Sequence, residues 1–162
     1  MDTFLTFMLG NESFAVPVFN VLEVLQKQTI TRVPKTPPHI LGIINFRGEI
    51  LPVFDTRQKF NLSATTEDEA KIVVVFEINE GNDKTTIAAT ADSVKDVIEI
   101  DHSEIKPVPV LGLDYDSRFI SGAIRRNDTF TLMLDIEKVF STADLTNVQQ
   151  IVNTKKLSET KN

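Results

Sequence analysis

The sequence contains no cysteine and no tryptophan, and a single tyrosine among its 162 residues. Without cysteine there is no disulfide, no thiolate nucleophile and no thiolate metal site, and a reducing compartment is permitted. The N-terminal residues carry Asp2 and no basic stretch of a secretory signal, and no apolar run approaches the roughly 18 to 20 residues of a spanning helix. We therefore expect a cytoplasmic protein that does not insert into the membrane.

Motifs for catalysis, cofactors and metals are also missing. His39 and His102 have no partner at zinc-site spacing, and no glycine-rich phosphate loop or nucleophile elbow occurs. Asp114 and Asp116, and an acidic run further upstream, are read as solvated loop charges rather than paired catalytic carboxylates; the run comprises Asp92, Asp96, Glu99 and Asp101. A net charge of −6 disfavours a nucleic-acid partner. We expect no enzyme activity, no cofactor and no metal.

The chain repeats itself internally. Residues 42–60 are echoed 80 positions later by residues 122–140, with Gly42/Gly122, Ile44/Ile124, Asp55/Asp135 and Phe60/Phe140 in register. Upstream the offset is 73, where Ala15/Ala88, Val21/Val94, Val24/Val97 and Pro34/Pro107 coincide. A duplication without an enzyme motif favours a binding scaffold.

Short β segments dominate the pattern. Alternating or β-branched apolar runs around turn residues predict hairpins at residues 3–16, 40–54, 71–91 and 120–135. Apolar spacing at 18, 21, 22 and 25 predicts a helical turn that runs into a strand at 29–33, and a further helix is expected at about 143–152. About five strands per copy suit two small closed barrels, because closure removes exposed edges. An acidic linker at 62–69 separates the copies.

Several motifs occur together in a specific order. Asn45-Phe46-Arg47-Gly48 is followed seven residues later by Asp55-Thr56-Arg57. LTFMLGNESFAV, ADSVKDVIEI and LDIEKVF lie on either side of that region. Together they resemble the bacterial CheW-type chemotaxis coupling proteins over nearly the whole chain.

The resemblance implies a mainly β fold of two SH3-like five-stranded barrels with short helices and a C-terminal helix. It implies one CheW-like domain at residues 1–152, with subdomains at about 15–66 and 67–140. The first strand and the C-terminal helix would pack across both, and 153–162 would form a flexible polar tail. The length leaves no room for kinase domains or an appended receiver domain.

The implied function is that of a non-catalytic adaptor. It would couple the cytoplasmic helical tip of chemoreceptors to the regulatory domain of a CheA-type histidine kinase, in arrays at the inner face of the membrane. Other CheW-like proteins of the array rings would be further partners. By the same resemblance, the receptor-binding residues are Val21, Glu23, Gly42, Arg47 and Gly122, and the kinase-binding residues are Asp92, Val94 and Val97.

Simpler explanations exist for these positions. Arg47 can solvate a tight turn, Gly42 and Gly122 can serve a backbone bend, and valines in strands belong to cores more often than to interfaces. Glu23 and Arg47 can pair with one another, although an exposed pair adds only about 0 to 1 kcal/mol.

Some positions depart from the family pattern. Phe46 stands where leucine is usual, Pro17 interrupts the second strand, and residues 91–94 lack a glycine. The fold expectation is unaffected, whereas the partner class stays open. Alternatives are a scaffold of a non-flagellar chemosensory pathway and a β-barrel module that holds a peptide or small ligand.

Overall fold

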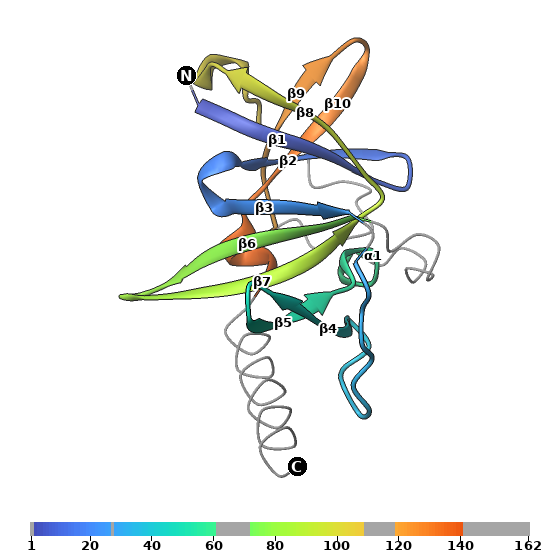
Figure 1. Ribbon diagram of the computed structural model, residues 1–162. Coiled ribbons are helices and arrows are strands. Elements are labelled where there is room, and N and C mark those ends of the chain that lie inside the picture. Colours follow the sequence, from blue (N-terminus) through green and yellow to red (C-terminus); the bar gives the residue numbers. More distant parts are fainter. Residues whose placement is uncertain (1, 27, 61–71, 109–118, 141–162) are drawn as a thin grey trace, which may run out of the picture.

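The described residues form two five-stranded sheets. The computed structural model describes residues 2–26, 28–60, 72–108 and 119–140 (Figure 1). Sheet A has the order β8-β1-β2-β10-β9 and consists of β1 (Asp2–Leu9), β2 (Glu12–Pro17), β8 (Ser93–Ile100), β9 (Ile120–Arg126) and β10 (Thr129–Leu134). Sheet B has the order β3-β6-β7-β5-β4 and consists of β3 (Val21–Gln26), β4 (Ile40–Phe46), β5 (Glu49–Phe54), β6 (Ile72–Glu80) and β7 (Asp83–Ala91). The mainly β fold with two five-stranded units is confirmed.

Each sheet takes strands from both copies of the repeat. Sheet A joins the β1-β2 hairpin of the first copy to β8, β9 and β10 of the second, and sheet B does the reverse. Met133 lies beside Ala15 in sheet A, and Val53 beside Ala88 in sheet B. These two parallel contacts are related by the same offsets of 80 and 73 that relate the two sequence copies.

The sheets therefore do not follow the subdomain boundaries expected at 15–66 and 67–140. Sheet B spans Val21 to Ala91, and sheet A combines the strands before and after it. The sequence repeat shows which strands are alike. It does not show that the hairpin of one copy pairs with the strands of the other, because pairing depends on contacts far apart in the chain.

Short backbone bridges join the edge strands of each sheet. Thr31, which follows β3, exchanges two hydrogen bonds with Ile43 on β4, with N···O distances of 2.9 and 2.8 Å. Lys106, which follows β8, exchanges two with Ala123 on β9, both of 2.8 Å. The edges are thereby paired within the chain, as expected for small barrels.

The two sheets share a phenylalanine-rich core. Phe14 of sheet A stacks on Phe60 at a centroid distance of 5.3 Å, and Phe54 of sheet B lies 4.7 Å from Phe140. All four rings are buried, and they belong to one cluster that draws on both sheets. Two smaller clusters fill the interior of sheet A around Ile100 and of sheet B around Val75, respectively.

Two one-turn helices follow equivalent strands. α1 (Thr56–Lys59) and α2 (Ile136–Val139) start after Asp55 and Asp135, whose carboxylates accept hydrogen bonds from the backbone of Gln58 and Glu137. Such N-caps satisfy amide groups that a helix start leaves free. None of the helices in the described ranges has the length and apolar character needed to cross a bilayer.

The predicted helical turn at residues 18–25 is wrong beyond its first three residues. A 3-10 turn, η1 (Val18–Asn20), precedes β3, and the expected strand at 29–33 contributes a single bridge. β3 has a bulge between Val21 and Glu23 and packs apolar side chains on both faces, Val24 toward the shared core and Leu25 toward the interior of sheet B. Because apolar residues occur on both faces of the strand, their spacing in the sequence resembles that of one face of a helix. The linker at 62–69, the helix at 143–152 and the tail at 153–162 lie outside the described residues.

Candidate partner-binding surfaces

Arg47 lies at the tip of the β4-β5 hairpin. It and Gly48 have positive φ angles of 52° and 85°, as a tight hairpin turn requires, and Gly48 N–H donates to Asn45 Oδ1 at 3.0 Å. Arg47 Nη2 donates to Glu23 Oε2 on β3 at 2.8 Å. The guanidinium also lies 4.9 Å from the ring centroid of Phe46. The Arg47 side chain is nevertheless 72% exposed. This end of sheet B therefore presents a guanidinium that is fixed by Glu23 and still accessible to a partner.

Gly42 on β4 and Gly122 on β9 are buried. Each lies next to the residue that is bridged to the segment at Thr31 or Lys106, respectively. A Cβ on Gly42 would collide with the carbonyl oxygen of Thr31, and a Cβ on Gly122 would lie 2.5 Å from Ile105 Cγ2. The chain itself therefore occupies the space over each glycine. The contacts that leave no room for a side chain here are made by another segment of the same chain, which the backbone bend expected from the sequence did not include.

The structure brings together part of the expected receptor-binding set. Glu23 and Arg47 are in contact, Val21 begins the same strand as Glu23, and Gly42 lies on β4 of the same sheet. Gly122 lies on β9 of sheet A, and Figure 1 shows β9 and β4 at opposite ends of the molecule. Four of the five residues thus belong to sheet B.

Asp92 is bound within the protein. Arg57 Nε and Nη2 donate to its two carboxylate oxygens at 2.9 and 2.7 Å, and Gly10 N–H donates to Oδ2 at 2.6 Å. Burial by itself would raise the pKa of Asp92, but the hydrogen bonds from Arg57 and Gly10 and the positive charge of Arg57 together lower it. At 22% exposure the side chain offers little surface to a partner.

The other two expected kinase-binding residues lie on β8, directly after Asp92. Val94 packs against the shared core, whereas Val97 is 62% exposed on this edge strand. The acidic run at 92–101 is thus largely a strand, in which Ile98 and Ile100 are buried and Asp96 and Glu99 face solvent. The charged residues on the solvent face made this strand look like an acidic loop in the sequence.

Sequence reasoning missed several residues at these surfaces. Arg57 was recognised as part of a motif, but its partner Asp92 is 35 residues away, and no spacing rule links them. Phe19 and Phe130 are 79% and 61% exposed. Their sequence neighbours gave no signal, because an exposed and a buried phenylalanine have the same local context in a short strand or turn.

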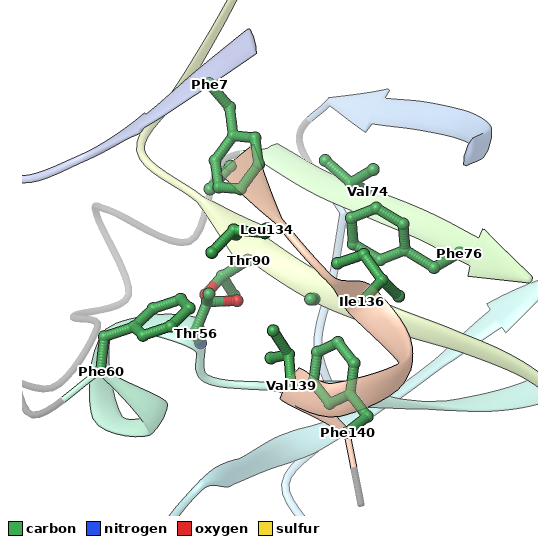
Figure 2. A pocket seen from close by; sticks show the side chains of 12 residues that line it. Phe7, Thr56, Phe60, Val74, Phe76, Thr90, Leu134, Ile136, Val139 and Phe140 are labelled. Atoms are coloured by element: carbon green, nitrogen blue, oxygen red, sulfur yellow. Dashed lines mark hydrogen bonds between the residues drawn. The ribbon is translucent and has the colours of Figure 1, made fainter. Parts of the chain in front are cut away.

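Within the described ranges, no group of three or more His, Asp or Glu side chains is placed to hold a metal ion. Figure 2 shows a cavity between the sheets that is lined by Phe7, Phe60, Phe140 and other mostly apolar side chains. It encloses about 10 Å³, the space of about one water molecule, and is too small for a ligand.

Known proteins resemble this chain along most of its length. The family model described as CheW-like domain matches residues 3–144. Chemotaxis protein CheW of Klebsiella aerogenes is 28% identical over 148 residues, covering 91% of this chain and 87% of that protein. Chemotaxis protein CheW of Helicobacter pylori is 30% identical over 136 residues, covering 84% and 79%, and Protein FrzA of Myxococcus xanthus is 32% identical over 143 residues, covering 86% of each. The crystal structure of scaffolding protein TtCheW from Thermoanaerobacter tengcongensis aligns with a TM-score of 0.75 at 28% identity, covering 88% of this chain and 90% of that one.

Proposed function

The chain belongs to the CheW-like domain family, and on this premise we propose that it is a non-catalytic adaptor that couples chemoreceptors to a CheA-type histidine kinase. The family match over residues 3–144 is the observation that carries the proposal. Several relatives of similar length are named chemotaxis protein CheW, and the similar crystal structure is named a scaffolding protein. Its place of action would be the cytoplasmic side of receptor arrays.

The receptor tip is assigned to the face of sheet B at β3 and the β4-β5 hairpin. Arg47 offers an exposed guanidinium whose position is fixed by Glu23, and a fixed donor fork suits a carboxylate on a receptor helix. Val21, at the start of β3, packs against the shared core, and Gly42 lets the segment at Thr31 lie close to β4. Gly122 has the equivalent role on sheet A and is assigned to the shape of that sheet rather than to contact.

The regulatory domain of the kinase is assigned to the β8 edge of sheet A. Val97 supplies an exposed apolar contact there, while Val94 anchors the strand to the core. Asp92 is assigned to holding the start of the strand, because its carboxylate is already bound by Arg57 and Gly10. Receptor and kinase would then occupy different sheets and could bind at the same time.

The test is calorimetric titration of the protein with the regulatory domain of a CheA-type kinase and, separately, with a receptor helical-tip fragment from the same cell. We expect micromolar binding to each, as for transient interfaces. Arg47→Glu should weaken receptor binding about tenfold or more and leave kinase binding unchanged. Binding of neither partner would contradict the adaptor function.

A charge-swapped variant distinguishes contact from support at Arg47. Glu23→Arg combined with Arg47→Glu can restore an ion pair between β3 and the hairpin but moves the cation to the other strand. We expect receptor binding to stay weak in this double variant. Full recovery would show that the ion pair, and not the guanidinium at the tip, is what the receptor site needs.

A further inference from the structure

Asp92 lies where the chain passes from sheet B to sheet A. It follows the last residue of β7 and precedes the first residue of β8. Its backbone N–H donates to Met8 O at 2.9 Å, and Oδ2 accepts from Gly10 N–H in the β1-β2 turn, so the residue is tied to sheet A twice. The two hydrogen bonds from Arg57 tie it to the other sheet, because α1 directly follows β5.

The Arg57 side of this contact is rigidly mounted. α1 is N-capped by Asp55, and Phe60 at its C-terminal end is fully buried and stacks on Phe14. The Arg57 side chain is 15% exposed, and its guanidinium binds both carboxylate oxygens. A forked, partly buried arginine-carboxylate pair fixes the relative orientation of its two partners more strictly than a single hydrogen bond does.

The opposite crossing, from sheet A to sheet B, is built differently. By the offsets of the repeat, Phe19 stands where the second copy has Asp92, and exposed Glu137 stands where the first copy has Arg57. In the described residues that crossing is held by Asn20, whose Nδ2 donates to Glu77 O at 3.2 Å. The same kind of crossing thus forms without a charged pair, so the fold alone does not require the pair at Asp92.

We propose that Arg57 and Asp92 form a positioning clamp, which sets the orientation of β8 relative to sheet B. The clamp fixes how the β8 edge with Val97 faces the hairpin with Arg47 on the other sheet. Its role in coupling rests on the proposed function. The clamp transmits the coupling between the receptor-binding and kinase-binding surfaces, and each surface can bind its own partner without the clamp. Asp92 and Arg57 are positioning residues in this assignment and need touch neither partner.

The orientation itself can be measured without any partner. The chain contains no cysteine, so spin labels on Lys95→Cys in β8 and Glu49→Cys in β5 report the distance between the two sheets. Pulsed electron paramagnetic resonance should give a narrow distribution in this labelled protein and a broader one after Asp92→Asn. An unchanged distribution in Asp92→Asn and in Arg57→Gln would overturn the clamp.

A matched control removes an ion pair inside a single sheet. Lys84 Nζ lies 3.3 Å from Glu77 Oε1, between β7 and β6 of sheet B. Lys84→Gln should leave the distance distribution unchanged. Arg57→Lys keeps the charge but loses the fork, and it should give an intermediate width, which also serves if Asp92→Asn does not fold. A width equal to that of the labelled protein would contradict the need for the fork.

The functional consequence is tested by the coupling between partners. Kinase-domain affinity is measured with and without saturating receptor fragment, in the unlabelled protein and in Arg57→Gln. We expect the separate affinities to change little and their mutual enhancement to fall about threefold or more, within the range of ordinary allosteric coupling. Unchanged enhancement overturns the coupling role. Failure of both partners to bind would overturn the proposed function, while the distance measurement still decides on the clamp.

Discussion

Two glycines at equivalent positions differ in how tightly the chain encloses them. A Cβ on Gly42 would meet the carbonyl oxygen of Thr31, which is backbone and accepts a hydrogen bond from Ile43 N–H at 2.8 Å. At Gly122 the nearest atom is a side-chain atom, Ile105 Cγ2, at 2.5 Å, and the nearest backbone atom, Lys106 O, is 3.1 Å away. The same small substitution should therefore have unequal costs.

We expect Gly42→Ala to lower the free energy of unfolding toward the upper end of the about 1 to 3 kcal/mol typical of overpacking, and Gly122→Ala toward the lower end. Urea denaturation of both variants measures the difference. Equal costs would show that the backbone of Thr31 is not what constrains Gly42.

Asp92 should make the stability of the protein depend on pH. Its pKa in the folded protein lies below its ordinary value of 3.8, so folding favours the carboxylate. The resulting stabilisation is complete above that ordinary value and is lost as the pH falls through the lowered folded pKa. Asp92→Asn removes this contribution.

The free energy of unfolding, measured by urea titration, should therefore differ most between the protein and Asp92→Asn at about pH 5 and above. The difference should shrink as the pH is lowered to about 2. A difference that stays constant over this interval would mean that the lowered pKa of Asp92 does not contribute to stability.

Single residues could be paired from the sequence where a family motif linked them. The Glu23–Arg47 pair was anticipated in this way and is present. The pair between Arg57 and Asp92 was not, because the two belong to different copies of the repeat and meet through sheet assembly. Local sequence patterns do not indicate such a long-range contact.

At the scale of elements, the β8 strand offers a direct test of the kinase surface. Val97 is exposed on its edge, and Phe130 on β10 is about equally exposed in the same sheet but lies outside the proposed surface. Val97→Lys should weaken binding of the kinase regulatory domain about tenfold, the effect of an interface residue worth roughly 1.4 kcal/mol.

Phe130→Lys is the matched control and should leave the kinase affinity unchanged. Both variants should unfold at the same urea concentration as the unmodified protein, because neither side chain contributes to the core. If Phe130→Lys weakens kinase binding and Val97→Lys does not, the surface belongs to the β9-β10 hairpin instead.

Hairpins were the elements that sequence patterns predicted best. The tight turns at Arg47-Gly48 and Asn127-Asp128 lie between apolar runs, and all four expected hairpins are present. The edge strands β3 and β8 were the failures. β3 has partly buried apolar residues on both faces, Val24 and Leu25, and its spacing looks helical. β8 carries its charges on the solvent side and looks like a loop.

At the scale of the whole molecule, the shared core should make the two sheets unfold together. Phe140 is buried against Phe54 of sheet B, although it follows the last strand of sheet A. Phe140→Ala should cost about 3 to 5 kcal/mol, as for a large buried aromatic side chain, and should weaken both sheets.

Fluorophores on cysteines introduced at Lys95 and Glu49 report on sheets A and B separately. They should give the same urea midpoint in the otherwise unmodified protein and the same lowered midpoint in Phe140→Ala, as two-state unfolding requires. Phe130→Ala should change stability by no more than about 0.5 kcal/mol. Two separate midpoints would show that each sheet is stable without the other.

The number of units was predictable from the sequence, but their composition was not. Five short strands per copy, with turn residues between them, lead to two small closed sheets. The exchange of hairpins between copies needs contacts such as Met133 with Ala15, which are more than a hundred residues apart. A sequence repeat is equally compatible with each copy forming its own sheet and with the two copies exchanging hairpins.

In the sequence, all strands of sheet B lie between the first two and the last three strands of sheet A, and this sets the order in which the sheets can be completed during synthesis. As the chain leaves the ribosome, the strands of sheet B are complete once Ala91 has emerged, whereas the β1-β2 hairpin, made first, must wait for β10, made almost last. During that interval the apolar side chains of the hairpin, Phe4 and Phe14 among them, lack their final neighbours. The nascent chain is then most open to misassembly at its oldest segment, and slow synthesis of the second half would prolong that exposure.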